Sequence, residues 1–516
     1  MSRVVVGHDV NDVRPLRREC RRPAKRRGQR HPAQRADHSP TGHRFAAHLS
    51  SPLEGKRTLP HAGEGVKLDI PARGAHDSNE GAVPNVGKRY AEPSLEVPQV
   101  SEQLTLSLAR DPQALAASEH VHRWYDYVQG FDAELAARKL REHSAGEDTV
   151  VLDPFCGSGT TLVAAQFLGF QAIGVDANPL MCLVSEAKTT WDVPLGQFKS
   201  RAADLLGALD RRLAEDDAGL AASCAIPMKS FNKWFLPSVL REVMAARQVL
   251  QELPPMERGV RNLLRMAYAK ALFESSQVSM CPGITFVKKP RPPLRVTLKR
   301  KLMTIATDLQ LLRGLDLDNQ PKARVFQGDA RNLSGKVAPG TVDILFTSPP
   351  YPTDIEYTRQ TRAELYFLGF IETMDDVRAI KRQMVRGSPK NIYKTDNNEQ
   401  LVAGYDSVQD VSAAIHEVTK NKNWGWDYPR MVREYFGDMF ACLREAHRVL
   451  RPGGWALLVV GDQTCKGVKI PVTDILRELG ADLGFTDSYI ETVRQRRSTT
   501  HSMSLPENTL ALRKPG

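Results

Sequence analysis

The sequence predicts an α/β fold, a doubly wound sheet of seven strands interrupted by a helical insertion. The first observation is an alternation in which apolar runs of strand length are followed by stretches whose apolar residues recur at helical spacing. The second is that two apolar runs, within Val150–Asp176 and Val342–Tyr351, end in turns rich in Gly or Pro. Because open α/β sheets bind their ligands at such strand ends, these stretches predict the functional site.

Length and composition indicate a soluble protein. The chain has 516 residues, 41% of them apolar, which is enough for two or three domains with sizeable cores. Its seven cysteines show neither Cys-x-x-Cys nor zinc-like spacing, so we expect a reducing compartment, no disulfides and no structural metal. Apolar runs stay below the roughly 18 residues of a membrane span. A bacterial-type cytoplasm is therefore the expected location.

Most of the positive charge lies in a leader. Residues 1–95 are rich in Arg, His, Pro and Gly and lack helical or strand periodicity, so we expect a disordered basic extension. Met1–Arg57 hold 14 basic and 5 acidic residues, most of the net charge of +11. The run Arg14–Arg30 is either a DNA-binding arm or a solvated leader without a role. On the rest of the chain, any DNA-binding face must be local.

Residues 96–191 are expected to form the first part of the core. His122–Tyr125 and Phe131–Ala136 lead into a helix that ends near Arg141. A strand, a Gly-x-Gly turn, a helix and a second strand then follow within Val150–Asp176. This order is typical of a nucleotide-binding unit.

The turn itself carries the candidate ligand contacts. Gly157 and Gly159 let the backbone approach a ligand where a side chain would block it. Thr160 can cap the helix that starts there. Asp176 lies where an acidic side chain in such a unit accepts hydrogen bonds from ribose hydroxyls.

Residues 192–321 are expected to be a helical insertion, since Phe231–Leu253 and Arg258–Val278 repeat apolar residues at helical spacing. No acidic residue lies between Ser276 and Thr307. Basic residues cluster there among prolines, either as a target-recognition or phosphate-contacting loop or as a solvated basic face. They are Lys288, Lys289, Arg291, Arg295, Lys299, Arg300 and Lys301.

Residues 322–516 are expected to form the second part of the core. The strand Ala323–Gln327 places Asp329 just beyond its carboxyl end. The strand of Val342–Tyr351 ends in Thr-Ser-Pro-Pro-Tyr, and the two prolines remove two backbone donors. A rigid set of acceptors beside an aromatic ring suits a planar ligand that carries an NH2 group.

The remaining segments complete the sheet. The polar stretch Arg382–Asp406 is expected to be a mobile loop. The other expected elements are a helix at Glu434–Leu450 with breakers at Arg451–Gly454, a strand at Trp455–Gly461, a helix at Val472–Leu483 and an antiparallel pair at Asp487–Val493 and Asn508–Arg513.

Together the two turn motifs resemble those of the amino-group DNA methyltransferases, which modify cytosine N4 or adenine N6. The resemblance implies a Rossmann-like methyltransferase fold, S-adenosylmethionine as cofactor and double-stranded DNA as substrate, and it leaves open a cognate restriction system. The motif order, glycine turn first, is similar to the unpermuted arrangement of these enzymes. The implied cofactor contacts are Phe131, Asp153, Phe155, Gly157, Gly159, Thr160, Asp176, Asp329 and Thr347, and the implied catalytic residues are Ser348, Pro349, Pro350 and Tyr351.

The implied chemistry needs no covalent attachment to the base. Ser348 and the Pro349 carbonyl would accept the hydrogens of the amine, and Tyr351 would stack on the flipped base. Cytosine C5 methylation needs a thiolate, usually in a Pro-Cys pair, but Cys281-Pro282 has the reverse order and lies off the sheet. Cys156 is expected to pack at the edge of the cofactor.

The identity of the base stays open at this point. Ser348 at the first motif position resembles the cytosine-N4 enzymes, whereas Asp or Asn there is commoner in adenine-N6 and guanine-N2 enzymes. A tRNA guanine-N2 methyltransferase would share the Asp153–Gly159 pattern but would be expected to carry Asp-Pro-Pro-Tyr and an upstream RNA-binding domain. A silent DNA-binding subunit with the same fold is the alternative from a different class. Cytosine N4 is the favoured target.

Overall fold

The computed structural model describes residues 116, 118–127, 131–215, 231–280, 284–287, 291–352, 356–422, 425–497 and 503–516. The chain divides into two compact units, Met1–Val86 and Gly87–Gly516, and every described residue belongs to the second. The expected disordered extension, residues 1–95, lies outside the described residues. Over the described part of the chain, no helix is long and apolar enough to cross a membrane.

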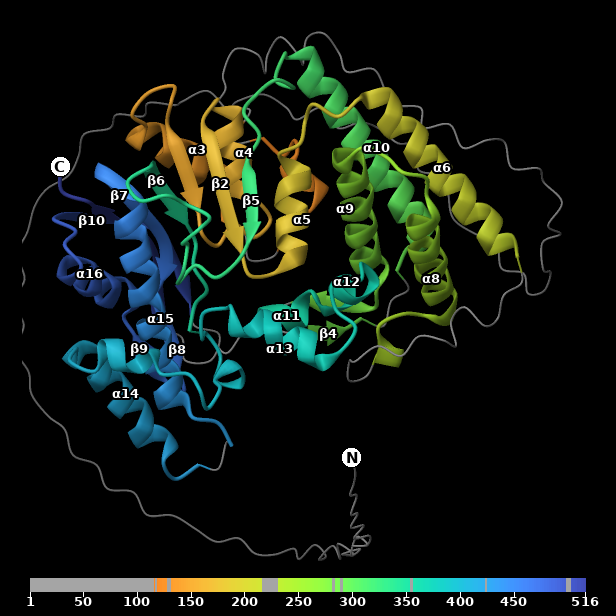
Figure 1. Cartoon of the computed structure of the whole chain (residues 1–516). Helices are drawn as coiled ribbons and strands as arrows, with labels where there is room; N and C mark the ends of the chain where they lie inside the picture. The colour runs from red at the N-terminus through yellow and green to blue at the C-terminus, as the bar shows by residue number, and fades with distance from the viewer. Residues whose placement is uncertain are drawn as a thin grey trace, which may run out of the picture. The chain divides into compact units, whose positions relative to one another are not determined.

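A seven-stranded sheet forms the centre of the second unit, as the sequence predicts (Figure 1). Its strand order is β10-β11-β7-β6-β1-β2-β5, and the five strands from β7 to β5 run parallel. The last two strands pair antiparallel with each other, and β11 pairs antiparallel with β7, which confirms the closing hairpin. The strands are β1 (Val150–Asp153), β2 (Gln171–Asp176), β5 (Arg324–Gln327), β6 (Val342–Thr347), β7 (Leu450–Gly461), β10 (Asp487–Arg497) and β11 (Ser504–Arg513).

Both faces of the sheet are covered, which explains why its central strands are almost continuously apolar. All six residues of β6 are buried. Neighbouring residues of one strand enter different cores: Val151 joins the cluster with α3, α4 and α5, whereas Leu152 joins the cluster with α15 and α16. These helices are α3 (Ala133–His143), α4 (Thr160–Phe167), α5 (Pro179–Lys188), α15 (Tyr428–Val449) and α16 (Val472–Asp482).

The segment between β2 and β5 is largely helical. Four of its helices pack on one another, and α9 also packs on α5 and so joins the core of the sheet (Figure 1). They are α6 (Leu195–Ala214), α8 (Pro237–Glu252), α9 (Arg258–Ser275) and α10 (Leu294–Gly314). A small hairpin, β3 (Val278–Met280) with β4 (Ile284–Phe286), precedes α10.

The basic cluster of this segment corrects one expectation. Arg295, Lys299, Arg300 and Lys301 lie in α10 and do not form a loop. The prolines that suggested a loop precede the helix, and Pro293 is its N-terminal flanking residue. Proline is compatible with that place because the first helical N–H groups have no partner within the helix.

Short elements follow β6 and return the chain to α15. They are the helices α11 (Tyr357–Gln360), α12 (Arg362–Phe367), α13 (Met374–Arg382) and α14 (Asp406–Thr419), and the 3-10 turns η3 (Pro389–Asn391) and η4 (Asn398–Val402). Two further 3-10 turns, η1 (His122–Trp124) and η2 (Phe231–Lys233), and a hairpin of β8 (Gln463–Cys465) with β9 (Val468–Ile470) complete the described elements.

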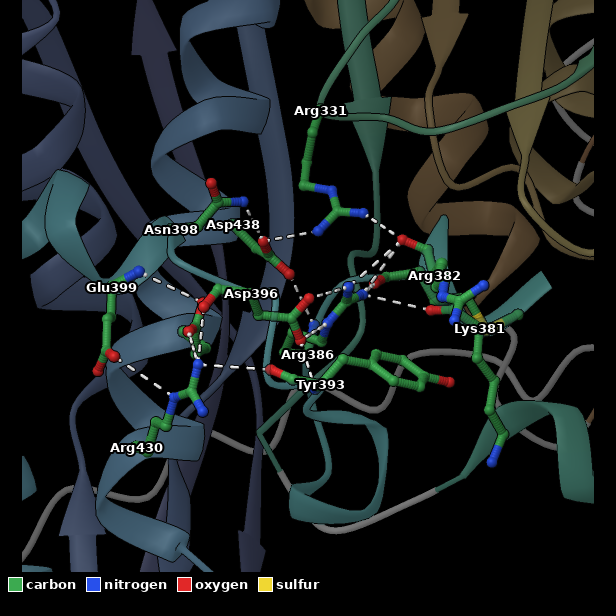
Figure 2. Close-up of polar contacts among 12 residues, drawn as sticks. Arg331, Lys381, Arg382, Arg386, Tyr393, Asp396, Asn398, Glu399, Arg430 and Asp438 are labelled. Carbon is green, nitrogen blue, oxygen red and sulfur yellow. Dashed lines mark hydrogen bonds and ion pairs between the residues drawn. The ribbon is translucent and has the colours of Figure 1, made fainter. Parts of the chain in front are cut away.

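The polar stretch Arg382–Asp406 is not the mobile loop that its composition suggested. Arg386 is buried, and its guanidinium pairs with Asp396, with its Nε 2.8 Å from Oδ2. The backbone N–H of Arg386 and the amide of Asn398 both donate to Asp438 of α15 (Figure 2). The polar residues therefore pair with one another, and the stretch is held against α15.

Candidate active site

A cavity of about 600 Å³ lies at the carboxyl edge of the sheet. The glycine turn and the Ser-Pro-Pro-Tyr motif both line it, although they are almost two hundred residues apart. Parallel strands bring their carboxyl ends to one edge, so β1 and β6, which pair directly, place the two motifs side by side. The sequence-predicted residues on the cavity wall are Phe131, Phe155, Gly157, Thr160, Asp176, Ser348, Pro349, Pro350 and Tyr351.

Asp153 and Thr347 lie behind this wall and are not among the residues that line the cavity. The Thr347 hydroxyl donates to Asp153 Oδ1 at 2.5 Å, and the backbone N–H of Phe155 donates to the same oxygen at 3.1 Å. Burial raises the pKa of Asp153 to about 6. Both residues are thus placed to hold the two motif turns together from behind.

The glycine turn adopts the backbone that its sequence indicates. Gly157 and Gly159 have φ angles of 50° and 84°, a left-handed region in which residues with a Cβ are strained. A Cβ at Gly159 would lie 3.0 Å from Ser185 Oγ of α5, so the turn and α5 pack closely. The expectation that Thr160 caps the helix is wrong. The helix α4 begins at Thr160, its N-cap is Gly159, and no side chain forms a capping hydrogen bond there.

Asp176 ends β2 and faces the cavity. One carboxylate oxygen accepts the N–H of Gly157 at 2.9 Å, and the other accepts the N–H of Asn178 at 2.8 Å. Each oxygen keeps a further lone pair for a ligand hydroxyl. Burial raises the pKa of Asp176 to about 6, so the carboxylate is largely charged at neutral pH.

Asp329 does not line the cavity, although its neighbours Gly328 and Ala330 do. Its carboxylate accepts hydrogen bonds from Nε and Nη2 of the Arg331 guanidinium, with Nη2 to Oδ2 at 2.7 Å. Arg331 continues to Asp438, Nη1 to Oδ1 at 2.8 Å, and so connects this strand end to α15 (Figure 2). In this arrangement Asp329 is engaged within the protein.

The Ser-Pro-Pro-Tyr motif forms the other side of the cavity. The Tyr351 hydroxyl donates toward Glu507 Oε1 at 3.3 Å and the Val459 carbonyl at 3.4 Å, and the side chain of Ser348 hydrogen-bonds it as well. Burial raises the pKa of Tyr351, so the hydroxyl is protonated at neutral pH. The Arg496 guanidinium carbon lies 5.5 Å from the centre of the Tyr351 ring.

Phe131 packs against a neighbouring ring and also faces the cavity. Its ring meets that of Phe346 edge to face at a centroid distance of 5.2 Å, and it also lines the cavity. Cys156 lines the cavity too, and burial raises the pKa of its thiol well above the ordinary value. A neutral thiol is a poor nucleophile, which agrees with a packing role.

Several lining residues escaped the sequence analysis. Gln383, Met384 and Val385 come from the stretch that had been expected to be a mobile loop. Five more come from the closing hairpin: Arg494, Arg496, Arg497, Leu505 and Glu507. The Arg-x-Arg-Arg spacing in β10 was the available signal, but only the antiparallel pairing of β10 with β11 shows that it lies at the cavity.

The basic residues proposed earlier for DNA contact lie elsewhere. Lys288 and Lys289 fall outside the described residues. Arg295 forms two hydrogen bonds of 2.7 Å with the Asp210 carboxylate. Arg300 and Lys301 both pair with Glu274, at 2.6 and 2.7 Å. For Arg291 and Lys299 no ion pair forms within the described part of the chain. Two carboxylates, Asp210 of α6 and Glu274 of α9, therefore pair with three of the five described basic residues of this stretch.

The residues present fit a nucleoside cofactor together with a planar base. A volume of about 600 Å³ falls within the roughly 300–1,000 Å³ of ligand pockets. The wall offers a charged acceptor for hydroxyls at Asp176 and exposed backbone at Gly157. Across the described residues, no group of three His, Cys, Asp or Glu side chains is placed to hold a metal ion.

Comparisons with known proteins agree with this arrangement. A family model described as DNA methylase (N6_N4_Mtase) matches residues 118–187, which include the glycine turn and Asp176. The Type II methyltransferase M.BsoBI of Geobacillus stearothermophilus is 24% identical over 441 residues, covering 77% of this chain and 85% of the relative. M.MvaI of Kocuria varians is 24% identical over 383 residues, covering 70% and 81%. M.AvaI of Nostoc sp. is 22% identical over 399 residues, covering 71% and 80%.

The two motifs, the cavity that they share and these matches lead to one family. They support the amino-group DNA methyltransferase family, enzymes that transfer a methyl group from S-adenosylmethionine to cytosine N4 or adenine N6.

Proposed function

We propose that this enzyme methylates the exocyclic N4 amine of cytosine in double-stranded DNA, at a specific recognition sequence. The observation that carries the proposal is Ser348, which stands at the first position of the catalytic motif and lines the cavity. Ser at that position resembles the cytosine-N4 enzymes. Because the relatives are named Type II methyltransferases, a restriction enzyme with the same recognition sequence is an expected partner.

Cofactor binding is assigned to the glycine turn and Asp176. When bound, S-adenosylmethionine supplies an electrophilic methyl group on its sulfonium. The Asp176 carboxylate accepts hydrogen bonds from the ribose hydroxyls, and the exposed backbone at Gly157 lets the cofactor lie close to the end of β1. Phe131 and Phe155 provide apolar wall on the same side. Asp153 and Thr347 act from behind, by fixing the turn relative to β6.

Catalysis is assigned to Ser348 and the Pro349 carbonyl. The lone pair of the amine is delocalised into the base, so the nitrogen is a poor nucleophile. Hydrogen-bond acceptors for its two N–H groups favour a tetrahedral nitrogen, in which the lone pair is available. Ser348 and the Pro349 carbonyl would accept hydrogen bonds from the two N–H groups and hold the nitrogen in position, and the proton that the methyl group replaces would pass to the surrounding water. Pro350 stiffens the turn, and the Tyr351 ring stacks on the flipped base, which offsets part of the cost of unstacking.

The decisive experiment is to identify the product. DNA from cells that express the full chain should contain N4-methylcytosine when digested to nucleosides and analysed by mass spectrometry. Single-molecule sequencing of the same DNA reports the recognition sequence. Cells that express Ser348→Ala provide the control for background methylation. If N6-methyladenine appears and N4-methylcytosine does not, the cytosine assignment is wrong although the family assignment stands.

A further inference from the structure

Three arginines of β10 line the mouth of the catalytic cavity: Arg494, Arg496 and Arg497. The side chain of Arg494 is 65% exposed, and Arg497 is also exposed, whereas Arg496 is 27% exposed. Glu507 of β11 is the carboxylate that balances them, with Oε2 at 2.5 Å from Arg494 Nε and Oε1 at 3.6 Å from Arg496 Nε. Within the described part of the chain Arg497 forms no ion pair, so the group keeps a net positive charge.

Among the three arginines, Arg496 contacts the Ser-Pro-Pro-Tyr motif. Its Nη2 donates to the Asp462 carbonyl at 3.1 Å, and its guanidinium faces the Tyr351 ring. A Cβ at Gly461 would overlap the guanidinium, so the glycine at the end of β7 leaves the space that Arg496 occupies. Arg494 and Arg497, on the same strand, are thereby placed beside the turn at which the base is modified.

We propose that Arg494 and Arg497 bind the backbone phosphates of DNA on either side of the flipped nucleotide. A base can enter the cavity only if its own phosphates reach the mouth, and guanidinium groups bind phosphate in a two-pronged geometry. The proposal rests on the proposed function, since it assumes that DNA is the substrate. Phosphate contacts fix position without reading sequence, so the recognition residues are elsewhere.

The basic stretch of α10 is the competing surface. There Arg295, Arg300 and Lys301 pair with carboxylates within 2.7 Å, and no described residue of the stretch lines the cavity. Arg497 forms no such pair with any described residue and, unlike the stretch of α10, lies on the cavity wall. Location at the cavity therefore favours β10.

The test is the salt dependence of binding of the full-length protein to a short fluorescent DNA duplex. Each lost phosphate contact should reduce the slope of log affinity against log salt concentration by about 1 and weaken binding about tenfold near 0.1 M salt. Arg497→Gln should show one such step, and Arg494→Gln with Arg497→Gln about two. S-adenosylmethionine affinity, measured by calorimetry, should match wild type in each. Arg494→Lys keeps the charge beside Glu507 and should keep the slope.

Arg477→Gln is the matched control, because it removes one half-exposed arginine from α16, away from the cavity wall. An unchanged slope in both Arg497→Gln and the double variant would overturn the proposal. An equal reduction of the slope in Arg477→Gln would overturn it too. So would a reduced slope in Arg300→Gln but in neither β10 variant, or a reduced slope with duplex RNA but not with duplex DNA. The proposed function is judged separately. If DNA from cells that express the wild-type protein contains N4-methylcytosine and the salt slope of the β10 variants is unchanged, only the proposed phosphate contacts are wrong.

Discussion

The Thr347 hydroxyl donates a 2.5 Å hydrogen bond to Asp153 and so joins the catalytic motif at the end of β6 to the cofactor turn at the end of β1. Both residues are buried, and Asp153 also accepts the N–H of Phe155 at the start of the turn. The buried carboxylate of Asp153 thus links the end of β6 to the turn that follows β1. This contact adds to the direct pairing of β1 with β6, which places the two turns side by side.

Removing that contact should cost stability. Thr347→Val keeps the shape of the side chain but removes the donor, so the free energy of unfolding should fall by about 1.5–3 kcal/mol, the scale of a hydrogen bond to a charged group. Thr347→Ser keeps the hydroxyl and should lose no more than about 1 kcal/mol for its missing methyl group. Urea unfolding followed by circular dichroism measures both. Equal stability of the two variants would show that the hydrogen bond contributes little.

A second prediction concerns the cofactor. Because Asp176 is assigned to the ribose hydroxyls, Asp176→Ala should weaken S-adenosylmethionine binding by one to two orders of magnitude, or about 1.5–3 kcal/mol. Asp474→Ala, which removes an exposed carboxylate on α16, is the matched control. Calorimetry on both variants, with folding checked by circular dichroism, gives the comparison. A folded Asp176→Ala protein with wild-type affinity would remove this residue from the cofactor site.

Cofactor binding should also depend on pH through the same residue. Burial raises the pKa of Asp176 to about 6, above its unfolded value, and hydroxyls donate well only to the charged form. Affinity should therefore be full near pH 7.5 and fall as the pH drops through about 6, with protons released on binding in that range. Calorimetry in two buffers of different ionisation enthalpy measures the release. Asp176→Asn should abolish it, and the same release in this variant would point to another group.

The residues at the strand ends could be predicted from sequence, whereas those set by distant pairing could not. The positions of Gly157, Asp176 and Ser348 follow from the rule that parallel strands end at one edge. The stretch around Arg386 was expected to be a mobile loop because composition does not distinguish solvated polar residues from ion-paired ones. Asp438, which accepts the backbone N–H of Arg386, is 52 residues away in sequence. The β10 arginines needed the order of the antiparallel strands, which no local pattern gives. The Asp329–Arg331 pair, two residues apart, was visible and was overlooked.

The network around Arg386 gives a second stability test. Arg386→Met should destabilise the protein by about 3–5 kcal/mol, because it leaves Asp396 without its partner beside buried Asp438. Arg378→Met, in the exposed pair with Asp375, should change stability by no more than about 0.5 kcal/mol. Thermal unfolding of both measures the difference. If the two variants melt together, the network in Figure 2 does not hold this stretch.

The catalytic assignment predicts a separation of binding from turnover. Replacing Ser348 or Tyr351 with Ala should leave S-adenosylmethionine affinity almost unchanged, since both residues are assigned to the flipped base. Methyl transfer should fall by about two to three orders of magnitude for Ser348→Ala, the usual loss when an acceptor aligned in the transition state is removed. Tyr351→Ala should also weaken DNA binding, because the stacking surface is lost. Single-turnover transfer of labelled methyl groups and calorimetry measure the two effects.

Tyr351→Phe discriminates between the ring and the hydroxyl. The ring is retained, so stacking should persist and turnover should fall only mildly, although the hydrogen bonds of the hydroxyl to Ser348 and Glu507 are lost. A loss as large as that of Tyr351→Ala would mean that the hydroxyl orients Ser348 for the reaction. If instead both Ala variants lost stability and cofactor affinity together, the motif would serve only to end β6, and the catalytic roles of Ser348 and Tyr351 would have to be abandoned.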